Sequence, residues 1–186
     1  MLRRWPLLAT AFLVGCTQVS KLAEFESPRA ISTSFDRLAS ILAGIQKARD
    51  SALYEGLPSE FWEPQLLERE LHAKRTVKLH GYPFYEDLLT LKEQDAAQLT
   101  ELFSAKGSFQ RYRSQKECGG YHADYCVEWK TGEAVTRALI CLECGEVKLF
   151  GPQAELHCDL SAKADKQLKQ SLSGYRKNRP ASEQSQ

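Results

Sequence analysis

Apolar residues recur at helical spacing through the first half of the chain. Successive apolar positions lie three or four residues apart, at Ile31, Phe35, Leu38, Leu42 and Ile45. This spacing predicts an amphipathic helix over residues 32–53. The turn-forming run 56–58 ends the helix, and Pro64 is placed to begin a second helix that continues to Leu71.

Shorter patterns occupy the middle of the chain. Residues 76–80 alternate between apolar and polar side chains and predict a short strand, and residues 81–85 form an aromatic turn. Thr90 and Glu93 have the spacing of a capping box, which predicts a third helix that closes at Gly107.

The period changes to two in the second half. Residues 123–130 alternate as a strand with one buried face, and turns at 131–133 and 144–145 lead into strands 134–141 and 146–150. A further strand carries Leu156, Cys158 and Leu160, and Ser161 is placed to cap a final helix. Helices followed by a meander of strands and a last helix indicate an α+β domain with an antiparallel sheet.

The first sixteen residues have the layout of an export signal. Arg3 and Arg4 precede an apolar stretch that is too short to span a bilayer, and the stretch ends in Leu13-Val14-Gly15-Cys16. This ending resembles the lipobox of bacterial lipoproteins. The resemblance implies cleavage before Cys16, a diacylglyceryl thioether on its sulfur and acylation of its new amine.

The resemblance also implies a location and an organisation. Thr17 replaces the Asp that favours inner-membrane retention, so we expect the periplasmic face of the outer membrane. The expected parts are a signal peptide (1–15), lipidated Cys16 with a tether (16–29), one α+β domain (30–175) and a flexible tail (176–186). The membrane is then a partner through the lipid, and an envelope protein is the second expected partner.

Composition and charge exclude several classes of protein. No run reaches the roughly 18 apolar residues of a spanning helix. The chain has 25 basic and 24 acidic residues, which gives no overall field for nucleic acid. Loss of residues 1–15 removes two arginines and no acid, so the mature charge is 23 − 24 = −1.

Five further cysteines lie in the second half of the chain, at Cys118, Cys126, Cys141, Cys144 and Cys158. An exported protein meets an oxidising compartment, so disulfide bonds are the preferred interpretation. Two bridges and one free cysteine can be arranged in fifteen ways. We favour Cys118 or Cys126 reaching the turn that holds Cys141 and Cys144, which closes a loop of roughly 15 to 27 residues and contributes about 2–4 kcal/mol.

The Cys141-Leu-Glu-Cys144 motif has two alternative interpretations. In a zinc knuckle, two more ligands would come from Cys118 with His122 or Cys126, while export disfavours the reduced thiols that zinc needs. In a redox site, the first cysteine usually lies at a helix N-terminus, whereas this motif sits between two predicted strands. Apart from the covalent lipid on Cys16, no cofactor is therefore expected, and zinc remains the alternative.

Other residues carry weaker hypotheses. Residues 81–85 form either an aromatic ligand platform or core packing, and the second is preferred. His122, Asp124 and Glu128 share one strand face that would suit a cation or a base, although a solvated polar face is the simpler interpretation. Residues 176–179 form a basic cluster at a helix end, and no phosphate loop or hydrolase motif is present.

Residues 118–129 and 140–148 together resemble a group of small, uncharacterised exported bacterial proteins. This resemblance covers about the second half of the mature chain and implies no catalytic or binding residue. The sequence therefore predicts a lipid-anchored envelope protein with a binding, assembly or maintenance role in preference to an enzyme. The competing hypothesis is a metal-binding or thiol-active protein that uses Cys141 and Cys144.

Overall fold

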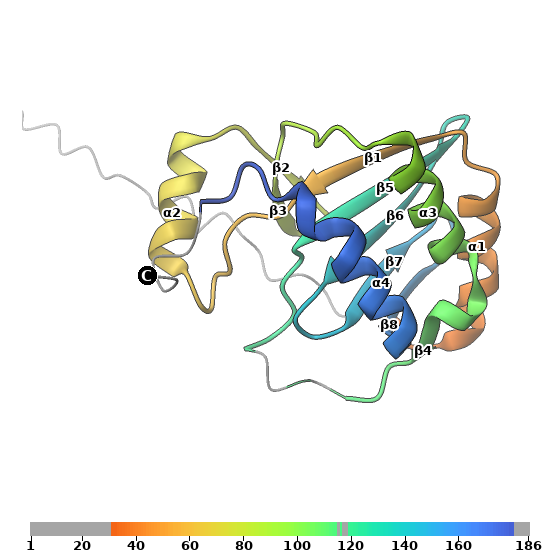
Figure 1. Ribbon diagram of the computed structural model, residues 1–186. Helices are drawn as coiled ribbons and strands as arrows, with labels where there is room; N and C mark the ends of the chain where they lie inside the picture. Colours follow the sequence, from red (N-terminus) through yellow and green to blue (C-terminus); the bar gives the residue numbers. More distant parts are fainter. Residues whose placement is uncertain (1–30, 115, 117–118, 181–186) are drawn as a thin grey trace, which may run out of the picture.

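A six-stranded antiparallel sheet organises the described part of the chain, with strand order β1-β5-β6-β7-β8-β4 (Figure 1). The computed structural model describes residues 31–114, 116 and 119–180. The strands are β1 (Asp50–Glu55), β4 (Phe109–Arg111), β5 (Tyr125–Thr131), β6 (Ala134–Cys141), β7 (Glu146–Phe150) and β8 (Glu155–Leu160). Strands β5 to β8 follow one another as hairpins, so the meander expected for the second half is confirmed.

Helices cover one face of this sheet. The described residues form α1 (Leu38–Gln46), α2 (Pro64–Ala73), α3 (Glu93–Ser104) and α4 (Ala162–Leu172), with short 3₁₀ turns η2 (Phe35–Arg37), η3 (Lys106–Ser108) and η4 (Ser173–Tyr175). Figure 1 shows α1, α3 and α4 lying across the sheet, with α2 set apart at one end. The α+β class predicted from the sequence is therefore confirmed.

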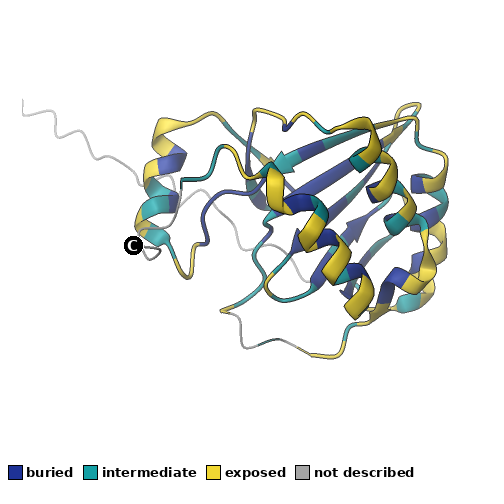
Figure 2. Ribbon diagram, in the orientation of Figure 1, coloured by how far each residue is buried: buried dark blue, intermediate teal, exposed yellow. Residues whose placement is uncertain are grey.

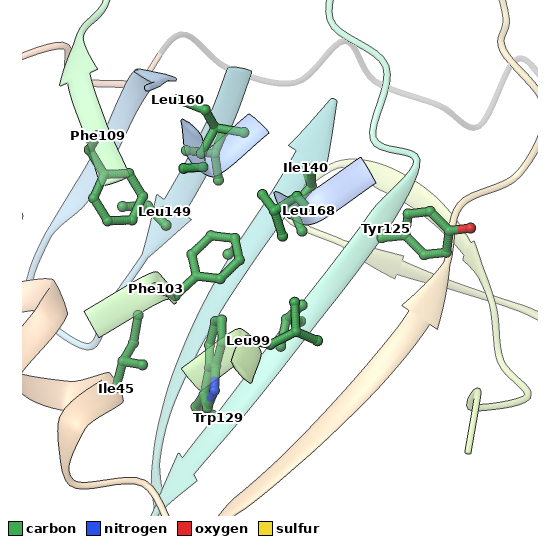
Figure 3. Close-up of a cluster of buried hydrophobic side chains, with 14 of the residues drawn as sticks. Ile45, Leu99, Phe103, Phe109, Tyr125, Trp129, Ile140, Leu149, Leu160 and Leu168 are labelled. Carbon is green, nitrogen blue, oxygen red and sulfur yellow. The ribbon is translucent and has the colours of Figure 1, made fainter. Parts of the chain in front are cut away.

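The core between the helices and the sheet is apolar and closely packed. Phe103 of α3 is fully buried, and its ring lies 5.9 Å from that of Phe109 and 5.2 Å from that of Trp129, measured between centroids. Figure 3 shows these rings pointing toward one another between the strands and the cut ends of the helices. Each such side chain removes more than 100 Å² of apolar surface from water, so this layer supplies most of the stability.

A two-stranded hairpin, β2 (Thr76–Leu79) and β3 (Tyr82–Tyr85), packs against the opposite face of the sheet. Its side chains Leu79, Tyr82 and Phe84 form a second buried cluster with Cys126 and Leu139, which point away from the helices. Both faces of β5 are therefore buried at its centre, where the sequence predicted only one (Figure 2).

The long helix predicted over residues 32–53 is wrong in its second half. Helix α1 ends at Gln46, and residues 50–55 form the edge strand β1, which pairs with β5. Helical spacing holds only as far as Ile45. Beyond it Leu53 is buried while its neighbours Ala52 and Tyr54 are half-buried, which is a strand pattern, and pairing with β5 decides the outcome.

Two local predictions in the middle of the chain also need correction. Residues 82–85 of the expected aromatic turn are strand β3, and the turn lies at His80 and Gly81, both in the left-handed region with φ of 51° and 89°. The capping box at Thr90 does not form, because α3 begins at Glu93 after Lys92 and has no side-chain cap. The short strand β4 was not predicted. Ser161 does cap α4, accepting a hydrogen bond from the Ala164 N–H at 3.3 Å.

The C-terminal boundary lies later than predicted. The carboxylate of Glu55 accepts hydrogen bonds from the backbone N–H groups of Lys177, Asn178 and Arg179, so the chain is docked beyond Tyr175. A flexible tail therefore cannot begin at residue 176. Residues 181–186 lie outside the described residues, as do residues 1–30 with the expected signal peptide, Cys16 and the tether.

Candidate functional site

Three of the predicted site residues, His122, Cys141 and Cys144, meet at one end of the sheet, around the turn between β6 and β7. Cys141 is the last residue of β6, and the turn closes through Gly145, whose φ of 63° favours glycine. The segment before β5 continues the ladder beside β6, because the Asp124 N–H donates to the Ile140 carbonyl at 2.8 Å. This pairing brings His122 and Asp124 to the Cys141–Cys144 turn.

Cys141 is a buried free thiol with 1% of its surface exposed. Its sulfur accepts a hydrogen bond from the Cys144 N–H at 3.4 Å, and a backbone contact with His122 acts in the same direction. Burial nevertheless outweighs both and raises the pKa of the Cys141 thiol to about 11. Cys141 is therefore protonated at neutral pH and is a poor nucleophile in this state.

The remaining described cysteines divide into two kinds. Cys126 and Cys158 are free and buried, and burial raises the pKa of each thiol. Cys158 packs among the apolar residues of the helix face, as its strand position predicted. Cys144 is disulfide-bonded, whereas Cys126, Cys141 and Cys158 are free. Bridges through Cys126 or Cys141 are therefore contradicted.

His122 is held between two acceptors, and Glu128 is not close to it. The Nε2 atom of His122 lies 2.8 Å from the Leu57 carbonyl oxygen, and Nδ1 lies 3.3 Å from the Asp124 carboxylate. Glu128 instead pairs with Arg137 at 2.7 Å and with Lys130 at 3.3 Å. The expected group of three on one strand face is therefore wrong.

Asp124 is the central polar residue of this end of the sheet. Burial on its own would raise its pKa, but His122, the Leu142 N–H at 2.8 Å and Arg179 together hold the pKa below its ordinary value. The Arg179 guanidinium lies 3.5 Å from Asp124 and also contacts Glu63 of the loop before α2. The carboxylate therefore stays ionised and ties the C-terminal segment to the sheet.

Glu55 was not singled out from the sequence, although it belongs to the same end of the sheet. It is 1% exposed, and three consecutive backbone N–H groups converge on its carboxylate, the shortest at 2.6 Å from Asn178. Burial of an ionised carboxylate is tolerated only with such partners. An isolated Glu at the end of an edge strand looks like a solvent-facing residue in the sequence, so no signal marks this role.

A lysine lies between two aromatic rings on the hairpin face. The Nζ atom of Lys148 is 4.9 Å from the centroid of Tyr82 and 4.1 Å from that of Tyr121, and it donates a hydrogen bond to the Tyr82 hydroxyl. Burial lowers the pKa of Lys148 to about 8, and the negative groups around it oppose this change only in part. In a strand whose side chains alternate between apolar and polar, a lysine at a polar position is expected to face solvent.

Two buried carboxylates stand opposite each other on β7 and β8. Glu146 and Asp159 are 3% and 2% exposed, and Lys116 lies 3.3 Å from the first and 2.9 Å from the second. His157 adds a contact of 2.9 Å to Glu146, and Arg113 one of 3.2 Å to Asp159. Both charges are therefore compensated by protein groups.

The zinc hypothesis gains no ligand set from this arrangement. Within residues 31–114, 116 and 119–180, no group of three or more His, Cys, Asp or Glu side chains is placed to hold a metal ion. Cys118, which that hypothesis requires, lies outside the described residues.

The expected aromatic platform at residues 81–85 is core packing, since Tyr82, Phe84 and Tyr85 are at most 9% exposed. Among the described residues, the large aromatic side chains that are exposed are instead Phe61 and Trp62 in the loop before α2, at 62% and 55%. Their rings meet edge to face, with centroids 4.6 Å apart.

A groove of 940 Å³ runs between α3 and α4 on the outer side of the helical layer. Its polar side chains come from both helices and from the turns at their ends, and they include Gln98, Gln167 and Gln170. No sequence pattern marks this groove, because it depends on how far apart the two helices lie.

Comparison with protein families, with curated proteins and with solved structures found no match to this chain. In the described part of the chain, no helix combines the length and apolar character needed to cross a membrane.

Proposed function

We propose that this chain is an exported lipoprotein held on the outer membrane by Cys16, with its α+β domain acting as a binding module on the periplasmic side. The leader that ends in Leu13-Val14-Gly15-Cys16 carries this proposal. Each buried methylene of an attached acyl chain contributes about 0.8 kcal/mol, so several chains hold a protein on a bilayer without a spanning helix.

The chemistry of the folded domain supports binding in preference to catalysis. Its most reactive candidate, Cys141, is buried with a raised thiol pKa, and the carboxylates of Glu146 and Asp159 are paired with basic groups. These arrangements stabilise a fold and leave little charge for acid–base chemistry. The groove between α3 and α4, in contrast, presents polar groups to solvent.

Cell fractionation of the Cys16→Ala variant tests the anchor. We expect the wild-type chain in the outer-membrane fraction and the variant outside it, because the thioether needs the Cys16 sulfur. The matched control is Thr17→Asp, which keeps the lipid and is expected in the inner-membrane fraction. Retention of Cys16→Ala in the outer membrane would overturn the proposal.

The second candidate function is thiol–disulfide chemistry at Cys141 and Cys144. One observation favours it: the free Cys141 sulfur lies 3.4 Å from the backbone nitrogen of disulfide-bonded Cys144. Labelling of the native, unreduced protein with a thiol reagent tests it. Rapid modification of Cys141 would support this candidate, and modification only after unfolding would reject it.

A further inference from the structure

The groove between α3 and α4 is tied at both ends. At one end, the Tyr175 hydroxyl donates to Asp95 and accepts from the Lys92 N–H at 3.1 Å, which joins the end of α4 to the start of α3. At the other end, the Ser161 N–H donates to the Ser108 carbonyl at 2.8 Å. The helices are therefore fixed at each end of a groove that stays open between them.

The rims of this groove present carboxamides. Gln98 of α3 and Gln167 and Gln170 of α4 line it and are exposed. Within the described part of the chain, their side-chain amides make no hydrogen bond to another residue. A carboxamide has an acceptor oxygen and a donor nitrogen, so each rim offers both roles to a ligand.

The charges that line the groove cancel. Lys92 and Lys163 contribute two positive charges, and Asp95 and Glu101 contribute two negative ones. A strongly acidic or basic ligand would gain nothing from this balance, whereas a neutral ligand meets no repulsion.

The floor of the groove is apolar and closed. Leu99 and Leu168 form part of it and are 2% and 0% exposed, because they are already packed into the core. No deep pocket is therefore available there for a large apolar side chain, which is the usual anchor of a bound peptide. Recognition must come mainly from hydrogen bonds along the rims, and the half-buried Leu102 supplies accessible apolar surface in the lining.

We propose that this groove binds a neutral oligosaccharide. Every sugar hydroxyl both donates and accepts, which matches the carboxamides, and the C–H face of a sugar ring can pack on Leu102. The volume of 940 Å³ is within the range of natural ligand sites and accommodates several sugar units. The inference deepens the binding role proposed above and rests on it, but it is independent of the lipid anchor.

Calorimetric titration of the full chain, purified from whichever fraction holds it, tests this site. The probes are the tetramer of N-acetylglucosamine and maltotetraose, with a neutral tetrapeptide as the comparison. We expect at least one saccharide to bind and the peptide not to bind. Because each lost hydrogen bond weakens binding about threefold to tenfold, Gln167→Ala and Gln170→Ala should each raise Kd by that factor. Gln94→Ala, on the same helical layer but outside the groove, should leave Kd unchanged.

A blocking variant makes the test independent of individual hydrogen bonds. Gly174 lines the groove, and a Cβ atom added to it would meet no atom within 4 Å, so Gly174→Trp introduces a bulky side chain at the groove without a clash at its first atom. This variant should abolish saccharide binding, while Gln94→Trp should retain it. Binding of neither saccharide, binding of the peptide alone, or saccharide binding that survives Gly174→Trp would each overturn the inference, whatever the lipid state of Cys16.

Discussion

The two faces of the sheet are built from different chemistry. The face under α1, α3 and α4 is mainly apolar, with Thr136 and Glu55 as buried polar side chains on it, and its cysteine, Cys158, is a packed free thiol. The face under the β2–β3 hairpin mixes aromatic rings with charged side chains, among them Glu128, Lys148 and Glu146. The stability of the first face therefore depends mainly on packing, whereas that of the second depends to a larger extent on charge pairing.

This difference separates what stabilises the fold from what makes it specific. An apolar layer tolerates volume-conserving exchange, while a buried charge fixes the identity of its partners. The hairpin face and the adjoining turn at Cys141 consequently carry most of the unusual residues of the domain. The groove proposed for binding lies on neither face but on the outer side of the helices.

The largest effect is expected from the apolar face. Phe103→Ala removes a fully buried ring that contacts the rings of Phe109 and Trp129, and it should lower the free energy of unfolding by about 3–5 kcal/mol. Urea denaturation measures this loss. Phe61→Ala is the matched control, because that ring is 62% exposed and its removal should cost less than about 0.5 kcal/mol. Equal losses for the two variants would contradict the described core.

The next effect concerns the disulfide at Cys144, beside the hairpin face. We predict Cys118 as its partner. The Cys144 sulfur lies 3.8 Å from the carbonyl oxygen of Gly120, and Gly120 is only two residues after Cys118 in the chain. Closure of that loop should contribute about 2–4 kcal/mol, so Cys118→Ala should lower the unfolding free energy by that amount. Peptide mapping without reduction identifies the pair. A bridge from Cys144 to any other cysteine would show that the assignment is wrong.

Charge pairing on the hairpin face predicts a smaller loss. Glu128 is 3% exposed and lies 2.7 Å from Arg137, so Glu128→Gln leaves a half-buried guanidinium without its counterion and should cost about 1–3 kcal/mol. The double replacement Glu128→Leu with Arg137→Leu should recover much of this loss. The control is Asp165→Asn, whose partner Lys169 is exposed, with an expected change below about 0.5 kcal/mol. A similar loss of unfolding free energy in Glu128→Gln and Asp165→Asn would contradict the role of charge pairing on the hairpin face.

The smallest effect is a pH dependence caused by Lys148 on the hairpin face. Burial lowers the pKa of Lys148 from 10.5 to about 8, so the folded chain releases this proton at a lower pH than the unfolded chain. Lys148 on its own should therefore make stability rise as pH increases from 8 toward 10. The three buried free thiols act in the opposite direction, because burial raises their pKa values and the unfolded thiols ionise first. Above pH 10 stability should fall further, because the unfolded tyrosines ionise before Tyr82 and Tyr121, whose pKa values burial raises.

Thermal unfolding of Lys148→Met across this range measures the contribution of Lys148. Between pH 8 and 10 the stability of Lys148→Met should fall more steeply than that of the wild type, and at pH 7 it should equal or exceed that of the wild type. Lys166→Met, which replaces an exposed lysine of α4, should keep the wild-type profile. The same slope in Lys148→Met and in the wild type would contradict the lowered pKa of Lys148.

Much of the fold could be predicted in the segments whose apolar positions follow a single period, either that of a helix or that of a strand. The meander from β5 to β8 and helix α4 with its Ser161 cap follow directly from alternation and capping. Prediction failed where tertiary pairing decides, as at residues 50–55, which continue a helical stretch in sequence but pair with β5 in space. The short strand β4 was also not predicted, because three residues are too few to show an alternating pattern.

The candidate site could be predicted only in part. Alternation correctly placed Cys158 among apolar side chains and Cys126 on the other face, and it brought Cys141 and Cys144 to a turn between strands. It could not show that a hairpin covers the second face. Residues such as Lys148 and Glu146 therefore looked solvent-exposed in sequence, although the structure half-buries Lys148 and fully buries Glu146. The lipid anchor differs from these residues, because its prediction depends only on the sequence of the leader and not on the fold.

Mass spectrometry of the N-terminal peptide of the membrane-extracted protein tests the central proposal most directly. The account predicts a peptide that begins at Cys16 and carries a diacylglyceryl group on its sulfur and an acyl group on its amine. A chain that retains Met1, or one that begins elsewhere with an unmodified Cys16, would contradict it.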